Sequence, residues 1–291
     1  MRIGVVFPQT EIGQDPAVIR DYAQAVESLG YTHILAFDSV VGPNPDRPGG
    51  WDSPYDYRHA FHEPFVLFGF CAGVTRHIEL VTGVLILPQR QTTLVAKQAA
   101  AVDVLSGGRL RLGIGVGWNP VEFEALGENI GDRGRRVEEQ LELMRLLWTR
   151  ELVTYTGQWH RMPDAGINPL PVQRPIPVWM GGEHEAVLRR AARLADGWIT
   201  LQTFRPGPQA QQTVDRLLDH VRDEGRDPGA FGVEGRVALA NIERGEWAKE
   251  METWRAMRGI SHLCVNTMGL GLSKPEEHAR TLERFKKDFL V

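Results

Sequence analysis

The sequence predicts an α/β fold, a (β/α)8 TIM barrel with an insertion before its fifth strand. Short apolar segments alternate with amphipathic segments along the whole chain, and eight such pairs can be traced. The 291 residues suit one barrel domain spanning residues 1–291. An open doubly wound sheet is the alternative that the same alternation allows.

The apolar segments are the expected strands, because parallel strands covered by helices on one face and a core on the other read as nearly continuous hydrophobic runs. They lie at residues 2–7, 33–37, 78–85, 110–116, 177–180, 198–200, 231–240 and 262–266.

The expected helices follow the strands in turn and carry recognisable start and stop signals. Asp15 and Pro16 form an N-cap and a first helical residue, and Gly30 is the stop. Gly107 and Gly108 end a later helix. The helices are expected near residues 15–30, 64–74, 94–105, 135–148, 185–194, 209–225, 247–257 and 275–289.

Two segments interrupt this rhythm. Residues 39–62 form a long polar loop after the second strand, and loops at that end of a barrel often shape a substrate pocket. Residues 151–176 are predicted to be an irregular insertion because glycines and prolines are scattered through them, at Gly157, Pro163, Gly166, Pro169, Pro171 and Pro175.

Composition narrows the class of protein. Hydrophobic residues make up 42%, enough for a full core. The net charge is −4 and no apolar run reaches membrane-spanning length, so we expect neither nucleic acid nor a membrane as a partner. Cys71 and Cys264 lie far apart in apolar surroundings, which indicates buried thiols in a reducing compartment rather than a disulfide. No secretory signal precedes the first strand, so a cytoplasmic location is expected.

In barrels of this kind the active site lies at the carboxyl ends of the strands. Asp38 stands at such an end, directly after an apolar strand. Burial there would raise its pKa and suit it to proton transfer or to hydrogen bonding with a cofactor. The alternative interpretation is a capping residue that ties down the following loop.

Gly181 and Gly182 follow the fifth strand and precede a helix start. Bare backbone at a helix N-terminus suits a phosphate group, although a plain strand–helix turn is the alternative. The run Gly113–Gly117 is not a dinucleotide fingerprint, because Trp118 occupies the sixth position and no helix start follows directly. These small residues either leave room for a flat ring system or fit a tapering barrel layer.

The long loop contributes the expected substrate pocket and a candidate acid or base. The pocket residues are expected to be Trp51, Tyr55, Tyr57, His59 and, after the fourth strand, Trp118. His62 is the candidate acid or base, with a plain helix-entry histidine as the alternative. His59 and His62 are three residues apart, but no further ligand completes a set, so no metal site is predicted.

The segments from Thr82 to Arg90, from Leu94 to Gly117 and from Met180 to Trp198 resemble the luciferase-like monooxygenase superfamily. Within it they are most similar to the oxidoreductases that depend on the deazaflavin coenzyme F-420. The resemblance covers most of the chain. It implies a barrel with an insertion before strand five, commonly assembled as a homodimer.

The resemblance also implies roles for individual residues. The third strand would carry a bulge with a non-prolyl cis peptide at Gly83–Val84, supporting one face of the coenzyme ring. Asp38 matches an acidic residue close to the ring, whereas Ser39 stands where some members have a catalytic histidine. The complete set of cofactor-binding residues expected is Asp38, Ser39, Thr82, Gly83, Val84, Gly115, Gly117, Met180, Gly181, Gly182, Thr200, Gln202 and Thr203.

The function expected from the resemblance is hydride transfer between coenzyme F-420 and a small organic substrate, with Asp38 and His62 as the candidate catalytic residues. An FMN-dependent monooxygenase that uses oxygen is the alternative, because both would share one barrel and one phosphate site. A barrel that binds flavin without catalysis is a third, weaker interpretation.

Overall fold

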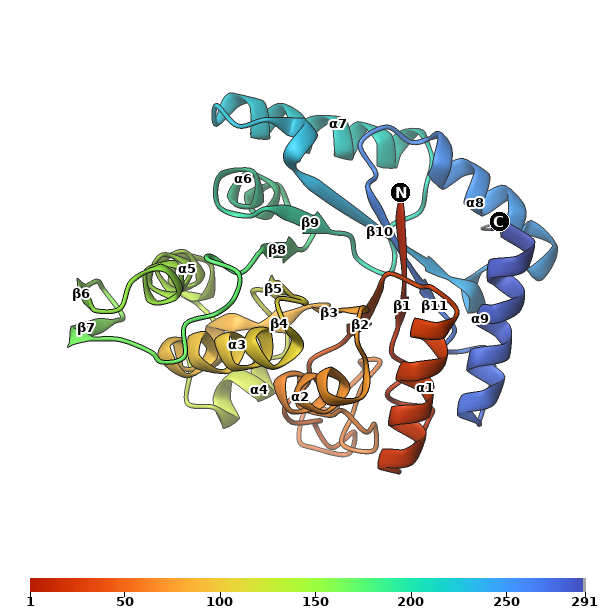
Figure 1. Ribbon diagram of the computed structural model, residues 1–291, viewed down its shortest axis with the longest axis horizontal. Helices are drawn as coiled ribbons and strands as arrows, with labels where there is room; N and C mark the ends of the chain where they lie inside the picture. Colours follow the sequence, from red (N-terminus) through yellow and green to blue (C-terminus); the bar gives the residue numbers. More distant parts are fainter. Residues whose placement is uncertain (290–291) are drawn as a thin grey trace.

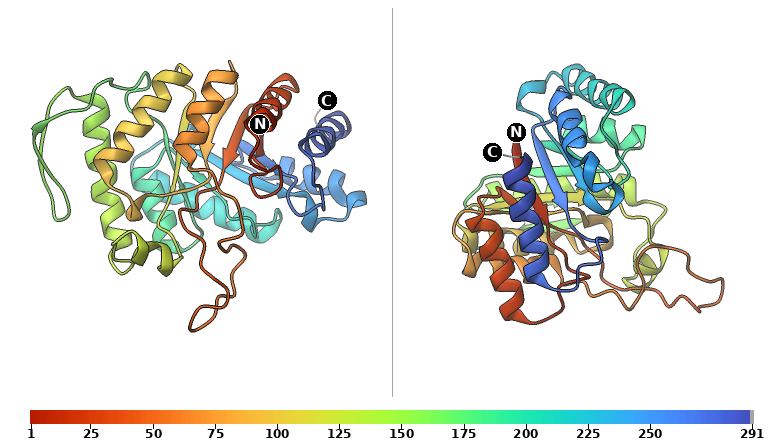
Figure 2. Two further views of the ribbon diagram at one scale, coloured as in Figure 1. Left: turned by 90° about the horizontal axis from the view of Figure 1, so that it is seen from below. Right: turned by 90° about the vertical axis from the view of Figure 1, so that its right-hand side faces the viewer.

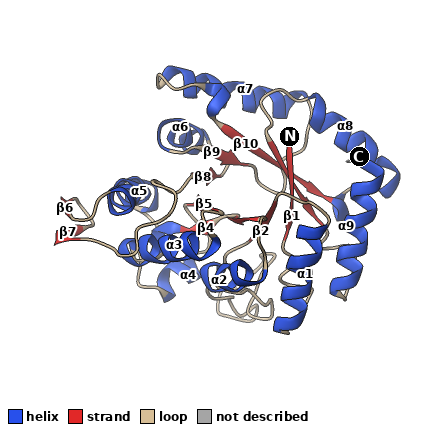
Figure 3. Ribbon diagram, in the orientation of Figure 1, coloured by secondary structure: helices blue, strands red, loops and turns tan. Residues whose placement is uncertain are grey.

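The computed structural model describes residues 1–289 and contains a closed barrel of parallel strands inside a ring of helices (Figures 1 and 3). The first strand pairs with both the second and the last, and β3 pairs with β5, so the sheet has no open edge. The barrel strands are β1 (Arg2–Val6), β2 (His33–Ala36), β3 (Glu79–Thr82) with its continuation β4 (Leu85–Ile86), β5 (Leu110–Gly115), β8 (Val178–Gly181), β9 (Gly197–Ile199), β10 (Gly232–Ala238) and β11 (His262–Asn266). This confirms the predicted (β/α)8 barrel and excludes the open sheet.

The helices cover the outside of the barrel in the predicted order. Local signals fix their ends: the Asp15 side chain accepts a hydrogen bond from the Ala17 amide at 2.8 Å, and Gly107 ends a helix with a φ of 68°. The helices are α1 (Pro16–Ser28), α2 (Pro64–Val74), α3 (Thr92–Ser106), α4 (Pro120–Ala125), α5 (Arg133–Thr149), α6 (Glu185–Leu194), α7 (Pro208–Asp223), α8 (Trp247–Ala256) and α9 (Pro275–Phe289). Within residues 1–289 no helix is both long and apolar enough to cross a membrane.

Two hydrophobic cores result from the closed sheet. The larger lies between the strands and the helices and includes Trp148, Trp198 and Trp254, all fully buried. The smaller fills the inside of the barrel with alternate strand residues such as Leu35, Val81 and Trp179. Both predicted cysteine thiols are free and buried.

The structure corrects two expectations. Residues 151–176 are not wholly irregular, because β6 (Val153–Thr156) and β7 (Arg161–Ala165) form an antiparallel hairpin that projects beside α5 (Figure 1). A helix does begin soon after Gly117: Asn119 caps α4 by accepting a hydrogen bond from the Val121 amide at 3.0 Å, and Pro120 is its first residue.

Candidate functional site

A cavity of about 220 Å³ opens at the carboxyl ends of the barrel strands. Seven of the predicted site residues line it: Asp38, Ser39, Tyr55, Gly83, Val84, Trp118 and Gln202. The long loop after β2, which stands out from the body in Figure 2, supplies Pro43, Tyr55 and Phe61 to its wall. The structure therefore brings residues from separate parts of the chain to one place.

The third barrel strand is bulged beneath this cavity. Val81 pairs with Arg111 and Leu85 pairs with Ile114, so four steps along the third strand face three steps along β5. The extra residue falls between β3 and β4, where the peptide bond Gly83–Val84 is cis. The bulge and the cis bond implied by the resemblance are both confirmed, whereas the continuous strand expected at 78–85 is divided.

The glycines around the bulge make room for protein, not directly for a ligand. A Cβ atom added to Gly115 would lie 2.6 Å from Val84 Cγ2, and one added to Gly181 would lie 2.8 Å from Val84 Cγ1. A Cβ atom at Gly113 would meet the Thr82 carbonyl oxygen, and the Thr82 hydroxyl donates to the Gly113 carbonyl oxygen at 2.6 Å. Small residues on β5 and β8 thus permit the Val84 side chain to reach the cavity wall.

Asp38 is held on both oxygens by neighbouring groups. Arg90 Nη2 donates to Asp38 Oδ1 at 2.7 Å, and the Ile86 amide donates to Oδ2 at 2.9 Å. The carboxylate is 1% exposed, and burial raises its pKa while Arg90 opposes that shift. Arg90 also donates to Glu63 at 3.0 Å. Asp38 therefore connects the end of β2 to the segment just after the bulge.

Glu122 fixes the residues that follow Asp38. Its Oε1 accepts from the Ser39 hydroxyl at 2.9 Å and from the Val40 amide at 2.6 Å. Glu122 is 4% exposed, lies on α4 and lines the cavity. The sequence analysis missed it because α4 itself was not expected.

The aromatic residues of the loop form a wall over one side of the cavity. The rings of Trp51 and Trp118 stack with centroids 5.7 Å apart at 23°. Tyr55 contacts Phe61 edge to face at 5.0 Å, and the Trp51 indole donates to the Tyr55 carbonyl oxygen at 2.8 Å. These contacts give the loop a defined path in spite of its length.

Other predicted site residues lie outside the cavity lining. His59 accepts a hydrogen bond from the Asp56 amide at 3.1 Å, and His62 has a buried Nε2 without a hydrogen-bond partner among the described residues. Tyr57 is 64% exposed, and Thr203 is exposed. Met180 and Thr200 are each 1% exposed. Gly117 has a φ of 78°, and a Cβ there would meet Ile86.

The expected phosphate position at Gly182 combines a feature that favours an anion with one that opposes it. Gly182 has a φ of 123°, which leaves its backbone bare, and its carbonyl oxygen accepts from the Trp198 indole at 2.7 Å. However, His184 caps α6 by accepting from the Ala186 amide at 3.3 Å. Glu183 Oε1 accepts from the Leu201 amide at 3.2 Å, and burial raises the pKa of Glu183. An anion at this helix start would meet a neighbouring acid.

Arg236 is the most unusual residue in the cavity wall, and the sequence analysis did not select it. It lies on β10 and is 5% exposed, and its side chain makes no hydrogen bond to any described residue. Its guanidinium carbon sits 5.1 Å from the centre of the Phe37 ring, which also lines the cavity. Burial lowers its pKa.

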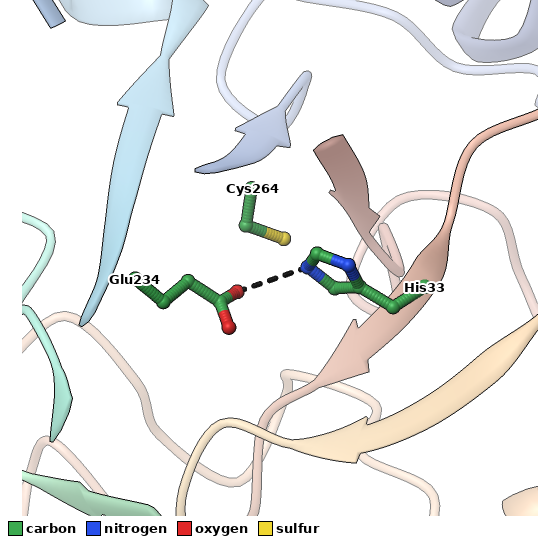
Figure 4. Close-up of side chains that lie close together, drawn as sticks. All are labelled: His33, Glu234 and Cys264. Carbon is green, nitrogen blue, oxygen red and sulfur yellow. Dashed lines mark hydrogen bonds and ion pairs between the residues drawn. The ribbon is translucent and has the colours of Figure 1, made fainter. Parts of the chain in front are cut away.

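A polar cluster lies inside the barrel, one layer below Arg236. Figure 4 shows Glu234 and His33 joined, with their nearest atoms 3.1 Å apart, and Cys264 beside them. These three residues have the spacing of metal ligands. However, Arg111 Nη1 donates to Glu234 at 2.6 Å, and burial raises the pKa of the Cys264 thiol well above its ordinary value. The cluster is better suited to an internal ion-pair network than to a cation.

A larger hollow of about 520 Å³ lies elsewhere on the same chain, between the segment after β10 and α9. None of the predicted site residues lines it; its wall includes Arg244, Trp247 and Arg284. The smaller cavity is therefore the candidate active site, because it combines the bulged strand with the predicted residues.

The cavity lies at the carboxyl ends of a closed parallel barrel, above a bulge in the third strand, and its lining is polar and aromatic. Enzymes with a parallel barrel bind small molecules at this end of the strands. A family model described as luciferase-like monooxygenase matches residues 1–285, so the chain belongs to the luciferase-like monooxygenase family. Its members are oxidoreductases and monooxygenases. The resemblance inferred from the strand motifs is thereby confirmed at the level of the family.

Comparisons with individual proteins agree with this assignment. The uncharacterized protein Rv0940c of Mycobacterium tuberculosis is 35% identical over 283 residues, which cover 92% of this chain and 93% of that protein. The monooxygenase RslO1 from Streptomyces bottropensis superposes with a TM-score of 0.77 at 20% identity, covering 100% of this chain and 98% of that one. An F420-dependent secondary alcohol dehydrogenase gives a TM-score of 0.73 at 17% identity, covering 91% and 92%. At such identities the structural likeness supports the fold alone.

Proposed function

We propose that this protein is an oxidoreductase that transfers a hydride between coenzyme F-420 and a small organic substrate at the cavity above Val84. The observation that carries the proposal is the bulge of the third strand at Gly83–Val84, which forms part of the cavity wall at the carboxyl ends of the strands. The preference for the deazaflavin rests on the resemblance of the strand motifs to that branch of the family.

The residues around the cavity fit a flat ring. Val84 and Gly83 offer a small apolar surface on one side, and the Tyr55 and Trp118 side chains stand on the other sides of the same cavity. Gln202 adds an amide, which can hydrogen bond to a ring carbonyl. Ligand pockets are commonly about 300–1,000 Å³, so a cavity of about 220 Å³ must widen to hold both ring and substrate. Movement of the long loop is the simplest way to widen it.

The anionic part of the coenzyme would run towards Gly181, Gly182 and the segment 200–203. Bare backbone at Gly182 supports this path, whereas Glu183 opposes it unless its carboxyl group is protonated or turned away. Arg205, whose Nη1 donates to the Gln202 carbonyl oxygen at 2.8 Å, supplies a positive charge on the same segment.

The coenzyme would supply the hydride chemistry, and the protein would position the reactants and exclude water. Asp38 would act as a positioning residue, because both of its oxygens already hold the backbone and guanidinium groups next to the bulge. His62 stays a prediction as an acid or base, since it does not line the cavity.

An FMN-dependent monooxygenase is the second candidate function. The family model describes a monooxygenase, and RslO1, which shares the fold, is itself a monooxygenase; both observations favour oxygenation. A monooxygenase would need the same ring surface, so the two functions differ in the coenzyme that binds and in oxygen consumption.

The deciding experiment is a titration of tryptophan fluorescence, since Trp118 lines the cavity. We expect coenzyme F-420 to quench the emission with micromolar affinity and FMN to have a much weaker effect. Tight FMN binding together with oxygen uptake by the reduced flavin would establish the alternative instead. Binding of neither compound would overturn both functions.

We also propose a homodimer, formed through α2 and α3. The sequence of α2 contains no charged residue, yet Val66 is 71% and Phe70 39% exposed on one face of it. Leu94 and Leu105 of the adjoining α3 are 52% and 67% exposed. An exposed face without charges is typical of a surface that another chain covers, and a second copy is the partner implied by the resemblance.

Light scattering after gel filtration tests this assembly. We expect a dimer mass for the wild type and a monomer mass for the Val66→Asp, Phe70→Asp double variant. Leu152→Asp is the matched control, because Leu152 is 62% exposed in the turn before β6 and should leave the mass unchanged. A monomeric wild type would refute the proposal.

A cytoplasmic location stays a prediction.

A further inference from the structure

We propose that Arg236 forms an anion-binding subsite in the barrel cavity and that the substrate is a small organic acid whose carboxylate binds this guanidinium. The inference rests on the proposed function, because it assigns the space beside the coenzyme ring to the substrate. It is carried by the position, burial and unsatisfied hydrogen-bonding capacity of one side chain.

The position of Arg236 follows from the alternation of strand residues. A Cβ atom on Gly235 would lie 2.4 Å from the Trp254 ring of α8, so residue 235 faces outward. Its neighbours on β10, Glu234 and Arg236, must then face the barrel interior. Arg236 pairs in register with Cys264 of β11, one full step nearer the mouth than Glu234, and it reaches the cavity wall.

The guanidinium has no carboxylate partner of its own. Its Nε is buried and unpaired, and no hydrogen bond links the Arg236 side chain to any residue from 1 to 289. Glu234, the nearest buried carboxylate, already receives hydrogen bonds from Arg111 at 2.6 Å and lies 3.1 Å from His33. Phe37 offers only its ring face, at 5.1 Å. Among residues 1–289, no carboxylate therefore forms an ion pair with the Arg236 guanidinium.

A buried cation without a counter-charge is costly unless a ligand supplies one. Arginine presents a planar fork of N–H donors that matches a carboxylate, and such a pair is both strong and directional. Tyr55 and Gln202 line the same cavity and are neutral hydrogen-bonding residues. The two carboxylates of the lining already have partners: Asp38 accepts from Arg90, and Glu122 accepts from Ser39 and Val40. A carboxylate is the ligand group that Arg236, Tyr55 and Gln202 would hold together.

The subsite is placed to serve the substrate rather than the ring. In the circular strand order the bulged third strand and β10 are separated by three strands in one direction, β5, β8 and β9, and by three in the other, β2, β1 and β11. They therefore face each other across the barrel. A ring lying against Val84 leaves Arg236 on the far side of the cavity, where a substrate facing the ring would bind.

The test compares carboxylates with their neutral amides on the full-length protein. Fluorescence titrations with acetate, acetamide, benzoate and benzamide are run with and without coenzyme F-420. We expect the wild type to bind benzoate at least tenfold more tightly than benzamide, and Arg236→Met to abolish this preference. Arg236→Lys should retain part of it. Arg258→Met, which removes a guanidinium that is 78% exposed, is the charge-matched control and should bind like the wild type.

Thermal melting of each variant checks that the loss is local. Arg236→Met should melt at or above the wild-type temperature, because an apolar side chain replaces an uncompensated charge. Equal affinities for benzoate and benzamide in the wild type, or an unchanged preference in a folded Arg236→Met or Arg236→Lys protein, would overturn the subsite. So would a loss of F-420 affinity in Arg236→Met without any change in the carboxylate preference. Failure of the proposed function is distinguishable, since it would abolish coenzyme binding in the wild type while the coenzyme-free preference for benzoate remained.

Discussion

Replacing Gly115 by alanine should push Val84 out of place, and a second substitution should restore it. The added Cβ atom would lie 2.6 Å from Val84 Cγ2, whereas carbon atoms in contact are normally about 3.5–4.0 Å apart. The overlap of roughly 1 Å involves a side chain whose other methyl group already lies against Gly181, so Val84 has little room to move.

The expected cost follows from this overlap. Overpacking a well-filled site destabilises a protein by about 1–3 kcal/mol. Val84→Ala alone should cost about 1 kcal/mol, because it loses two methyl groups at about 0.8 kcal/mol each when fully buried and Val84 is only half-buried. In the double variant the clash is absent, so its unfolding free energy should be close to that of Val84→Ala. The coupling energy should therefore equal the cost of Gly115→Ala, about 1–3 kcal/mol, in favour of the double variant.

Urea unfolding monitored by circular dichroism measures all four proteins of this cycle. Gly235→Ala is the matched control, since its Cβ atom would lie 2.4 Å from the Trp254 ring on the outer side of β10 and far from the bulge. Val84→Ala should not rescue that variant. If Gly115→Ala and Val84→Ala prove additive within about 0.5 kcal/mol, the glycine does not serve the Val84 side chain.

Three further predictions concern buried charges. Glu234→Gln should lower the unfolding free energy in urea titrations by about 3–5 kcal/mol. Burial alone would raise the pKa of Glu234, but Arg111 and His33 lower it well below the usual range. A loss under about 1 kcal/mol would mean that the Glu234–Arg111 ion pair is not needed for stability. Burial lowers the pKa of His278 to about 4, so on acidification the unfolded chain takes up a proton near pH 6.5 while the native protein does not. The unfolding free energy should therefore fall by on the order of 3 kcal/mol between pH 6.5 and pH 4. His278→Phe should flatten that part of the pH–stability curve. Asp38→Ala should reduce kcat more than coenzyme affinity in steady-state assays, since it frees Arg90 and the Ile86 amide beside the bulge, and unaltered kinetics would leave Asp38 with a capping role only.

The order of elements was predictable because each depends on local chemistry. Short apolar runs and amphipathic segments, together with signals such as Asp15–Pro16 and Gly30, located eight strands and their helices. The closure of the sheet followed from counting units. The bulge at Gly83–Val84 was reached through resemblance, since no local pattern in those residues distinguishes a bulged strand from a straight one.

The missed elements have local explanations as well. The run Val153–Thr156 consists of β-branched and aromatic residues, which favour a strand, but the nearby prolines predicted irregular structure. Pro163 is compatible with β7 because β7 pairs with β6 on one side only. A proline at a position whose N–H would face away from β6 removes no hydrogen bond from the sheet. Asn119 and Pro120 begin α4, but this helix was not predicted because six residues are too few to show a helical apolar pattern.

The glycines show why site residues are harder to predict than strands. Gly115 was expected to leave room for a ring and Gly181 to let a phosphate group approach, but a Cβ atom at either position would meet the Val84 side chain. Whether a glycine accommodates a ligand or another side chain depends on the register between β3, β4, β5 and β8. A one-residue bulge changes that register, and sequence periodicity does not record it.

Arg236, in contrast, could have been predicted as a site residue from the sequence alone. A buried parallel strand normally holds apolar residues at every position, yet β10 reads Gly-Val-Glu-Gly-Arg-Val-Ala, with two charges spaced to face the same side. Glu234 finds its partners in Arg111 and His33, one layer below. Arg236 has no partner among the described residues, although one more acidic side chain at a neighbouring strand position would have provided it. A charge that a fold could easily neutralise and does not is best explained by a ligand that neutralises it, which is why the acid–amide comparison is the most informative measurement on this protein.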